Sequence, residues 1–265
     1  MLKQRVISAV VLIPVVAALA WLGGWWFSVF VALYAGVTAW ELLRLVGMND
    51  FAQPMMWLGV PVSALLVLEG GLPLDPVRLQ ALLATIVLVG LTAALFVDRK
   101  NAPTDLLITL GGAFYLGLTL RFLALLRNRE EGLLWLLVMA VTVWVMDSGA
   151  YFVGRALGRH KFGPRISPKK TWEGFFGGLV SGAIAAALMA QFLLPGVAWR
   201  QGALLGVAIG IVGPLGDLSE SLFKRQAGAK DSSHLIPGHG GFFDRIDSFI
   251  FVAPVVFLIV QFGFH

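Results

Sequence analysis

The stretch that decides the fold is GLLWLLVMAVTVWVMDSGAYFVGRAL, residues 132–157. It carries no charged residue between Leu133 and Met146, and Asp147 then stands inside the run. A helix needs about 20 predominantly apolar residues to cross the hydrocarbon core of a bilayer, so the stretch predicts a transmembrane helix. It also lacks the apolar–polar alternation of barrel strands. Because backbone polar groups in lipid must be satisfied within a helix or a closed barrel, the fold class predicted is an all-α membrane bundle.

Further apolar runs extend this prediction to a polytopic bundle of about nine transmembrane helices. The composition agrees, since 58% of the 265 residues are hydrophobic and only 13% are charged, against about 25% charged in soluble domains. The third run is short for a span. The other eight predicted spans are 6–23, 25–46, 55–69, 79–97, 104–126, 173–194, 201–223 and 248–264.

Two features of the sequence argue against a cleaved signal peptide and against cysteine chemistry. The first run follows Lys3 and Arg5, as in a signal peptide, but GGWW (23–26) and a second apolar run come directly after it, so a transmembrane helix is favoured over a cleaved leader. The chain has no cysteine, which excludes disulfides, thiolate metal sites and a cysteine nucleophile. Any metal must be held by oxygen or histidine.

The polar residues divide the chain into two predicted regions. Residues 1–130 are predicted to be a scaffold of transmembrane helices that also offers oligomer contacts. Residues 131–265 are predicted to carry the catalytic loops, at 158–172 and 224–247, because these are the two long polar segments between spans.

The basic residues predict the orientation of the bundle. With nine spans and a cytoplasmic N-terminus, all but five of the 20 lysines and arginines lie on or near the cytoplasmic side. The exceptions are Arg78, Arg121, Arg127, Arg129 and Arg200. This bias follows the positive-inside rule, so both polar loops are predicted to face the cytoplasm.

Acidic residues within or at the ends of spans mark the candidate site, because each costs several kcal/mol in lipid unless it is paired, hydrated or metal-bound. Asp244 and Asp247 are three residues apart, which places both on one helix face. GPLGD (213–217) predicts a helix break beside Asp217. Converging carboxylates repel one another unless a cation lies between them, and oxygen ligands favour Mg²⁺. The acids concerned are Glu41, Asp147, Asp217, Glu220, Asp244 and Asp247.

The two polar loops supply candidate phosphate ligands. PGHGGFFDR (237–245) has three glycines that allow left-handed turns and close approach of backbone N–H groups to an anion. SPKKT (167–171) places hydroxyl and ammonium groups before the predicted span 173–194, where the positive end of the helix dipole favours phosphate. A purely interfacial role for these lysines, or simple pairing of the acids with neighbouring basic residues, stays open at this point.

Two segments resemble the phosphatidate cytidylyltransferase family, the CDP-diacylglycerol synthases. SESLFKRQAGAKDSSHLIPGHGGFFDRID (219–247) resembles the family signature, and DSGAYFVGRALGRHKFGPRISPKKTWEG (147–174) resembles its upstream segment. The resemblance covers roughly the last 120 residues. It implies transfer of CMP from CTP to phosphatidate, with release of pyrophosphate, by Mg²⁺-dependent attack at the inner membrane of a bacterium, on its cytoplasmic side. It implies CTP, phosphatidate and membrane lipids as partners, and no nucleic acid.

The resemblance and the residue chemistry together give the predicted site. Catalytic residues are Asp217, Lys224, Lys230, Asp244 and Asp247, and the metal ligands are Asp147, Asp217, Asp244 and Asp247, with room for a second cation. Substrate-binding residues are Ser167, Lys169, Lys170, Thr171, Ser219, Arg225, Gly238, His239, Gly240, Gly241 and Arg245. The small residues of FFGGLVSGAIAAA (175–187) permit either a homodimer or close packing within the fold.

Two other functions remain open from the sequence. A secondary transporter also shows intramembrane acids and broken helices, but no internal repeat is visible here. A transferase that consumes CDP-diacylglycerol fits the composition as well, but the spaced aspartate pattern expected of it is absent.

Overall fold

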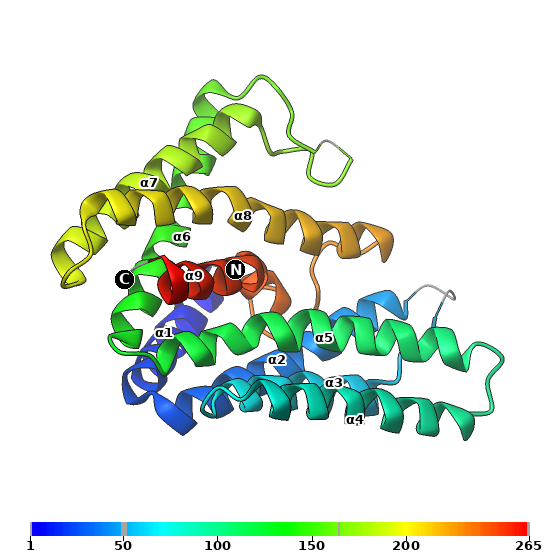
Figure 1. Cartoon of the computed structure of the whole chain (residues 1–265). Coiled ribbons are helices and arrows are strands. Elements are labelled where there is room, and N and C mark those ends of the chain that lie inside the picture. The colour runs from blue at the N-terminus through cyan, green and yellow to red at the C-terminus, as the bar shows by residue number, and fades with distance from the viewer. Residues whose placement is uncertain (1, 49–51, 164, 264–265) are drawn as a thin grey trace. The chain divides into compact units, whose positions relative to one another are not determined.

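The computed structural model describes residues 2–48, 52–163 and 165–263, and within these ranges the chain is helical with no β-strand. The order of elements along the chain is shown in Figure 1. The helices are α1 (Leu2–Leu22), α2 (Gly24–Val46), α3 (Met56–Gly70), α4 (Pro76–Leu95), α5 (Ala102–Arg127), α6 (Gly132–Leu157), α7 (Trp172–Leu193), α8 (Trp199–Gln226) and α9 (Phe243–Phe262).

The predicted helical membrane fold is confirmed. Six of the described helices, α2 and α4 to α8, are long and apolar enough to cross a membrane. The described apolar part of α1, Val10–Leu22, and the helix α3 are shorter. The largest shift from prediction concerns α9, which begins at Phe243 rather than near residue 248. Its first turn therefore contains Asp244.

By packing, the chain forms two compact units. The first comprises residues 1–125 and 223–244, and the second comprises residues 126–222 and 245–265. The loop that carries most of the glycine-rich motif thus packs with the N-terminal helices. The functional division at residue 130 stays a prediction.

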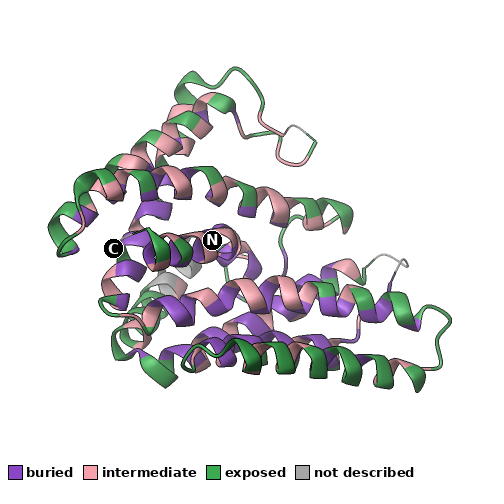
Figure 2. Ribbon diagram, viewed as in Figure 1, coloured by how far each residue is buried: buried purple, intermediate pink, exposed green. Residues whose placement is uncertain are grey.

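In the first unit, α3, α4 and α5 pack around a shared apolar core. Leu58, Val62 and Leu66 from α3 contact Leu106 and other buried residues of α5. Figure 1 shows these helices running alongside one another. Figure 2 shows α4 exposed along most of its length, and only Ile86 and Gly90 of this helix are buried. Since α4 is predominantly apolar from Ala81 to Leu95, its exposed side is suited to lipid.

In the second unit, glycines bring α7 into close contact with α6 and α8. A Cβ at Gly178 would lie 3.0 Å from the carbonyl oxygen of Met146 on α6. A Cβ at Gly206 on α8 would lie 2.5 Å from the carbonyl oxygen of Gly182. The small residues of 175–187 are therefore used in packing within the unit, as small residues are in membrane bundles generally.

The helix break predicted at GPLGD is wrong, because α8 runs without interruption from Trp199 to Gln226 with Pro214 inside it. Proline removes one N–H donor and disturbs the preceding turn, yet a transmembrane helix tolerates this when other groups satisfy the freed backbone. The glycines of the motif serve packing instead. A Cβ at Gly216 would lie 2.3 Å from the carbonyl oxygen of Asp247, so only glycine lets α9 approach so closely.

Candidate functional site

Three carboxylates meet in the second unit. Asp217 and Glu220 lie three residues apart on α8, and Asp247 projects from α9; each offers an oxygen within 4.8 Å of the others. The close approach of the two helices at Gly216 explains why Asp247 reaches this position. Glu220 is buried, with 2% of its surface exposed. The acidic cluster, meaning Asp217, Glu220 and Asp247, has the oxygen donors that a hard divalent cation prefers.

Lys170 pairs with Asp217 of the acidic cluster. Its Nζ lies 2.8 Å from Oδ2 of Asp217 and donates a hydrogen bond to the carbonyl oxygen of Pro214 at 3.3 Å. The hydroxyl of Ser221 donates to Oδ1 of Asp217 at 3.3 Å. The three carboxylates offer oxygens that converge beside this ammonium, so the donor set fits a divalent metal.

The loop at 158–172 is folded by its own backbone contacts, and these place Lys170. The amide of Phe162 donates to the carbonyl of Lys170 at 2.9 Å, and the amide of Lys170 donates to the carbonyl of Ser167 at 3.2 Å. Thr171 follows as the N-cap of α7, where its hydroxyl accepts from the amide of Gly174 at 3.2 Å. The loop therefore holds Lys170 at the start of α7 as a folded turn.

The other residues predicted in this loop lie differently. Lys169 is exposed, whereas Ser167 is half-buried and Thr171 is buried. Asp147, on α6, interacts electrostatically with Asp217 and Lys170. Of the predicted metal ligands, the structure thus brings together Asp217 and Asp247, with Asp147 nearby.

In the first unit, Asp244 binds the loop that precedes it. Its Oδ1 pairs with Nζ of Lys224 at 2.7 Å. Its Oδ2 accepts from the amide of Ser232 at 2.9 Å, from the hydroxyl of Ser232 at 2.8 Å and from the amide of Gly241 at 2.8 Å. Both carboxylate oxygens are therefore engaged, and through them Asp244 holds Ser232 and Gly241 close to each other.

The glycine-rich turn lies in the segment between Ser232 and Gly241. Gly238 and Gly240 have φ of 78° and 83°, in the left-handed region that favours glycine. The amide of Ile236 donates to the carbonyl of Gly240 at 2.9 Å, and the amide of His239 donates to the carbonyl of Ile236 at 2.9 Å. The turn is compact, and Pro237 and Gly238 are exposed. Anion binding by this turn stays a prediction.

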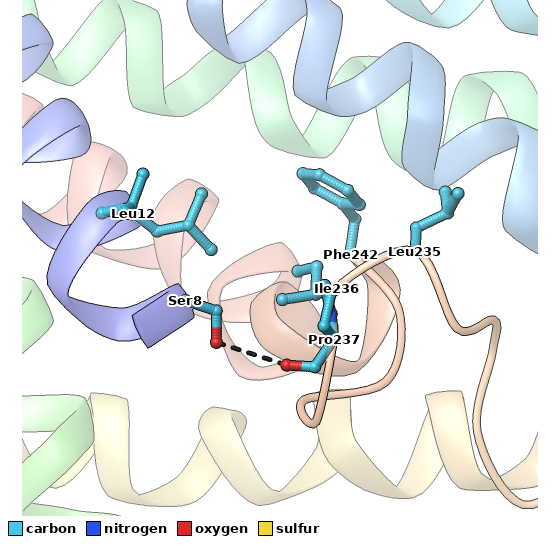
Figure 3. A pocket seen from close by; sticks show the side chains of 7 residues that line it. Ser8, Leu12, Leu235, Ile236, Pro237 and Phe242 are labelled. Atoms are coloured by element: carbon cyan, nitrogen blue, oxygen red, sulfur yellow. Dashed lines mark hydrogen bonds between the residues drawn. The ribbon is translucent and has the colours of Figure 1, made fainter. Parts of the chain in front are cut away.

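One edge of the turn borders α1. A hydrogen bond of 2.8 Å joins Oγ of Ser8 to Nδ1 of His239. Figure 3 shows the second contact of Ser8, which donates to the carbonyl oxygen of Pro237 at 3.3 Å. Beside this contact is an apolar pocket of about 360 Å³ whose walls include Leu12, Ile236 and Phe242. His239 is thus tied to a helix at the opposite end of the sequence.

The remaining predicted residues lie on α8, in the following loop and on α9. Ser219 is half-buried on α8, while Arg225, Lys230 and Arg245 are exposed. Exposure suits these three residues to contact a charged substrate, and their roles stay predictions.

The sequence interpretation noted Glu220 as an intramembrane acid but did not assign it to the metal site. The signal was present, because Asp217 and Glu220 have the i, i+3 spacing that puts both on one helix face. Because a helix break was expected at Asp217, the shared helix face of Asp217 and Glu220 was not recognised.

Comparison with known proteins identifies the family. The model of the cytidylyltransferase family matches residues 3–263. A phosphatidate cytidylyltransferase of Bacillus subtilis is 32% identical over 98% of this chain and 97% of its own length. One of Synechocystis is 35% identical over 97% and 96%, and one of Brucella suis is 36% identical over 97% and 92%.

The similarity extends further than the signature segments suggested. It includes α1 to α5, in which the sequence alone showed only apolar helices. The resemblance to phosphatidate cytidylyltransferases is confirmed, and the chain belongs to the cytidylyltransferase family.

Proposed function

We propose that the protein transfers the CMP group of CTP to phosphatidate, giving CDP-diacylglycerol and pyrophosphate. A phosphate oxygen of phosphatidate forms a bond to the α-phosphorus of CTP. The bond between the α-phosphorus and the oxygen that bridges to the β-phosphorus breaks, and its electron pair leaves with pyrophosphate. Because a phosphate monoester is already ionised at neutral pH, the reaction needs no nucleophile from the protein, and positioning and charge neutralisation suffice.

The observation that carries this proposal is the acidic cluster in a chain of the cytidylyltransferase family. Asp217, Glu220 and Asp247 offer oxygens close enough to hold one divalent ion, and Mg²⁺ is the ion that such sites combine with nucleotide phosphates. Bound there, Mg²⁺ supplies charge neutralisation at the transferred phosphate and the leaving group. Asp147 on α6, which interacts electrostatically with Asp217, is proposed as a further ligand.

The basic residues and the glycine-rich turn are proposed to bind the substrate phosphates. Lys170 is tied to Asp217 and can neutralise a phosphate held by the same metal. The glycines at 238 and 240 are proposed to let the backbone of the turn approach the triphosphate closely. Lys169, exposed at the start of α7, is proposed for the lipid phosphate. Asp244 and Lys224 are proposed to keep the turn in place, since each is engaged by the other.

The site is proposed to face the cytoplasm from the inner membrane of a bacterium. The charge bias of the sequence supports this orientation, because the loops 158–172 and 224–247 hold many of the basic residues. CTP is a cytoplasmic nucleotide and phosphatidate is a membrane lipid, so a loop site at that interface has access to both.

An assay of the purified protein in detergent tests the proposed function. With CTP, phosphatidate and Mg²⁺, the expected products are CDP-diacylglycerol and pyrophosphate in equal amounts. Consumption of CDP-diacylglycerol with release of CMP, or no reaction of phosphatidate with CTP, would contradict the proposal.

A further inference from the structure

Glu41 on α2 is bound to both ends of the glycine-rich loop. Its side chain is fully buried, with 0% of its surface exposed. At the start of the loop, the hydroxyl of Ser232 donates to Oε2 at 3.0 Å and the hydroxyl of Ser233 donates to Oε1. At the end of the loop, the amide of Phe242 donates to Oε1 at 3.0 Å and the amide of Phe243 donates to Oε2 at 2.7 Å.

The space around this carboxylate is filled by the loop itself. A Cβ at Gly241 would lie 2.0 Å from Oγ of Ser232 and 2.6 Å from Oε1 of Glu41. Two turns earlier on α2, the hydroxyl of Tyr34 donates to the carbonyl of Phe242 at 3.0 Å, and the two rings meet edge to face with centroids 4.9 Å apart. The loop therefore packs against α2.

A buried carboxylate in a membrane helix costs several kcal/mol unless its oxygens are hydrogen-bonded. Glu41 recovers this cost from two main-chain amides of the loop and the hydroxyl of Ser233, together with the hydroxyl of Ser232, whose single hydrogen is shared with Asp244. Removing an acceptor would leave these amides buried and unsatisfied, which costs more than the lost bond alone. The contacts of Glu41 thus fix the backbone of 232–233 and 242–243 at the same time.

The segment between these two anchors is the turn that contains Gly238, His239 and Gly240. A turn whose backbone contacts an anion binds it best when that backbone is held in place before the anion arrives. Asp244 supplies a second fixed point, since Oγ of Ser232 lies 2.8 Å from its Oδ2 and 3.0 Å from Oε2 of Glu41. One serine hydroxyl therefore connects the two carboxylates.

We infer that Glu41 is a positioning residue for nucleotide binding: it holds both ends of the loop 232–243 so that the turn at 238–240 is preorganised for the phosphates of CTP. This inference rests on the proposed function. The sequence marked Glu41 as an intramembrane acid but gave it no role. It acts through the loop, by orienting the turn that is proposed to contact the substrate.

The variant Glu41→Gln tests the inference. Glutamine has nearly the same shape, but only one of its terminal atoms accepts hydrogen bonds, so the donors facing the other atom lose their partner. The apparent KM for CTP is expected to rise about tenfold or more, as the loss of two hydrogen bonds to a charged group implies. The KM for phosphatidate is expected to change less than about twofold, which is the variation found between sites that do not interact. Hydrogen–deuterium exchange should increase in 232–243 and stay as in wild type in α3 to α5.

Two further variants keep the test decisive if Glu41→Gln does not fold. Ser233→Ala removes one donor and leaves the carboxylate in place, so a smaller rise in the KM for CTP is expected. Ser63→Ala is the matched control, because this buried hydroxyl on α3 donates to the carbonyl of Ala35 and has no contact with the loop. Its KM for CTP should equal that of wild type.

The outcomes separate the inference from the proposed function. An active Glu41→Gln enzyme with unchanged KM for CTP and unchanged exchange in 232–243 would overturn the inference and leave the proposed function intact. Loss of protection throughout α2 to α5, with equal effects on both substrates, would also overturn it, since Glu41 would then serve only the fold. Wild-type protein that fails to join CTP to phosphatidate would overturn the proposed function itself.

Discussion

Nζ of Lys170 lies 2.8 Å from Oδ2 of Asp217, so a lysine from the loop before α7 is paired with a carboxylate of the acidic cluster on α8. The pair is partly exposed, with 23% of the lysine side chain and 41% of the aspartate side chain accessible. A metal ion entering the cluster must compete with this ammonium for Asp217. Binding of a metal ion to the cluster would therefore affect the position of the loop 158–172, which carries Lys170.

The variant Lys170→Met is expected to bind Mn²⁺, measured by electron paramagnetic resonance without nucleotide, about two- to fivefold more tightly than wild type. This range corresponds to the free energy of a partly exposed ion pair. Turnover is expected to fall in the same variant, because the positive charge near the substrate phosphates is lost.

Lys169→Met is the matched control for this measurement. It removes the same charge from the neighbouring, exposed position, so any effect on the affinity for Mn²⁺ comes from long-range electrostatics, which solvent screens. If Lys169→Met tightened Mn²⁺ binding as much as Lys170→Met, direct competition at Asp217 would be excluded.

Gly241→Ala is expected to abolish activity and to lower the thermal stability of the protein. A methyl group at this position would lie within 3 Å of both Ser232 and Glu41, and all these groups are held by hydrogen bonds. Gly111→Ala serves as the control, since a Cβ there meets nothing within 4 Å and the site is inside α5. Near-normal activity of Gly241→Ala would show that the loop can shift without losing its function.

Thr171→Ala is expected to lower the free energy of unfolding by about 1 kcal/mol, the typical value of a lost N-cap. The hydroxyl of Thr171 accepts from the amide of Gly174 and begins α7. Denaturant titration in detergent, followed by tryptophan fluorescence, measures the change. Thr171→Ser should retain most of the stability, and an equal loss in both variants would assign the effect to the methyl group.

The predicted topology can be tested with single cysteines, since the chain has none of its own. Gly163, Gly196 and Gly228 are poor positions for them, because each has a left-handed φ that strains other residues. Arg165→Cys, His234→Cys and Ala198→Cys use exposed neighbouring positions instead. An impermeant thiol reagent should label the first two only from the cytoplasmic side and the third only from the opposite side.

Labelling of residues 165 and 198 from one side would contradict the predicted topology. These positions flank α7, and a helix that crosses the membrane must separate them.

Much of the fold could be predicted because lipid imposes a length and a composition on each span. The start of α7 was predicted within a residue, as Glu173 against Trp172, where a polar loop meets an apolar run. The start of α9 was missed because Asp244 and Asp247 made the first turn look like loop. Asp244 is tolerated there because it is bound by the loop, and Asp247 accepts a hydrogen bond from the amide of Ser248.

The candidate site was predictable in its residue types and less so in its pairings. Sequence spacing relates residues on one helix, as with Asp217 and Glu220, but it does not report contacts such as those of Glu41 with Phe242 and Phe243, about 200 positions away. The reading of GPLGD failed for a related reason. Whether a proline breaks a helix depends on its surroundings, and α8 continues through Pro214.

The most direct test of the account follows CTP labelled at its α-phosphate in the presence of phosphatidate and saturating Mg²⁺, with wild type and Asp217→Asn compared at equal folded concentration. Wild type should transfer the label to CDP-diacylglycerol. Asp217→Asn should lose at least about a hundredfold in turnover, as enzymes do when a group that stabilises transition-state charge is removed. Transfer by Asp217→Asn at the wild-type rate would contradict the claim that the acidic cluster holds the metal ion that the reaction needs.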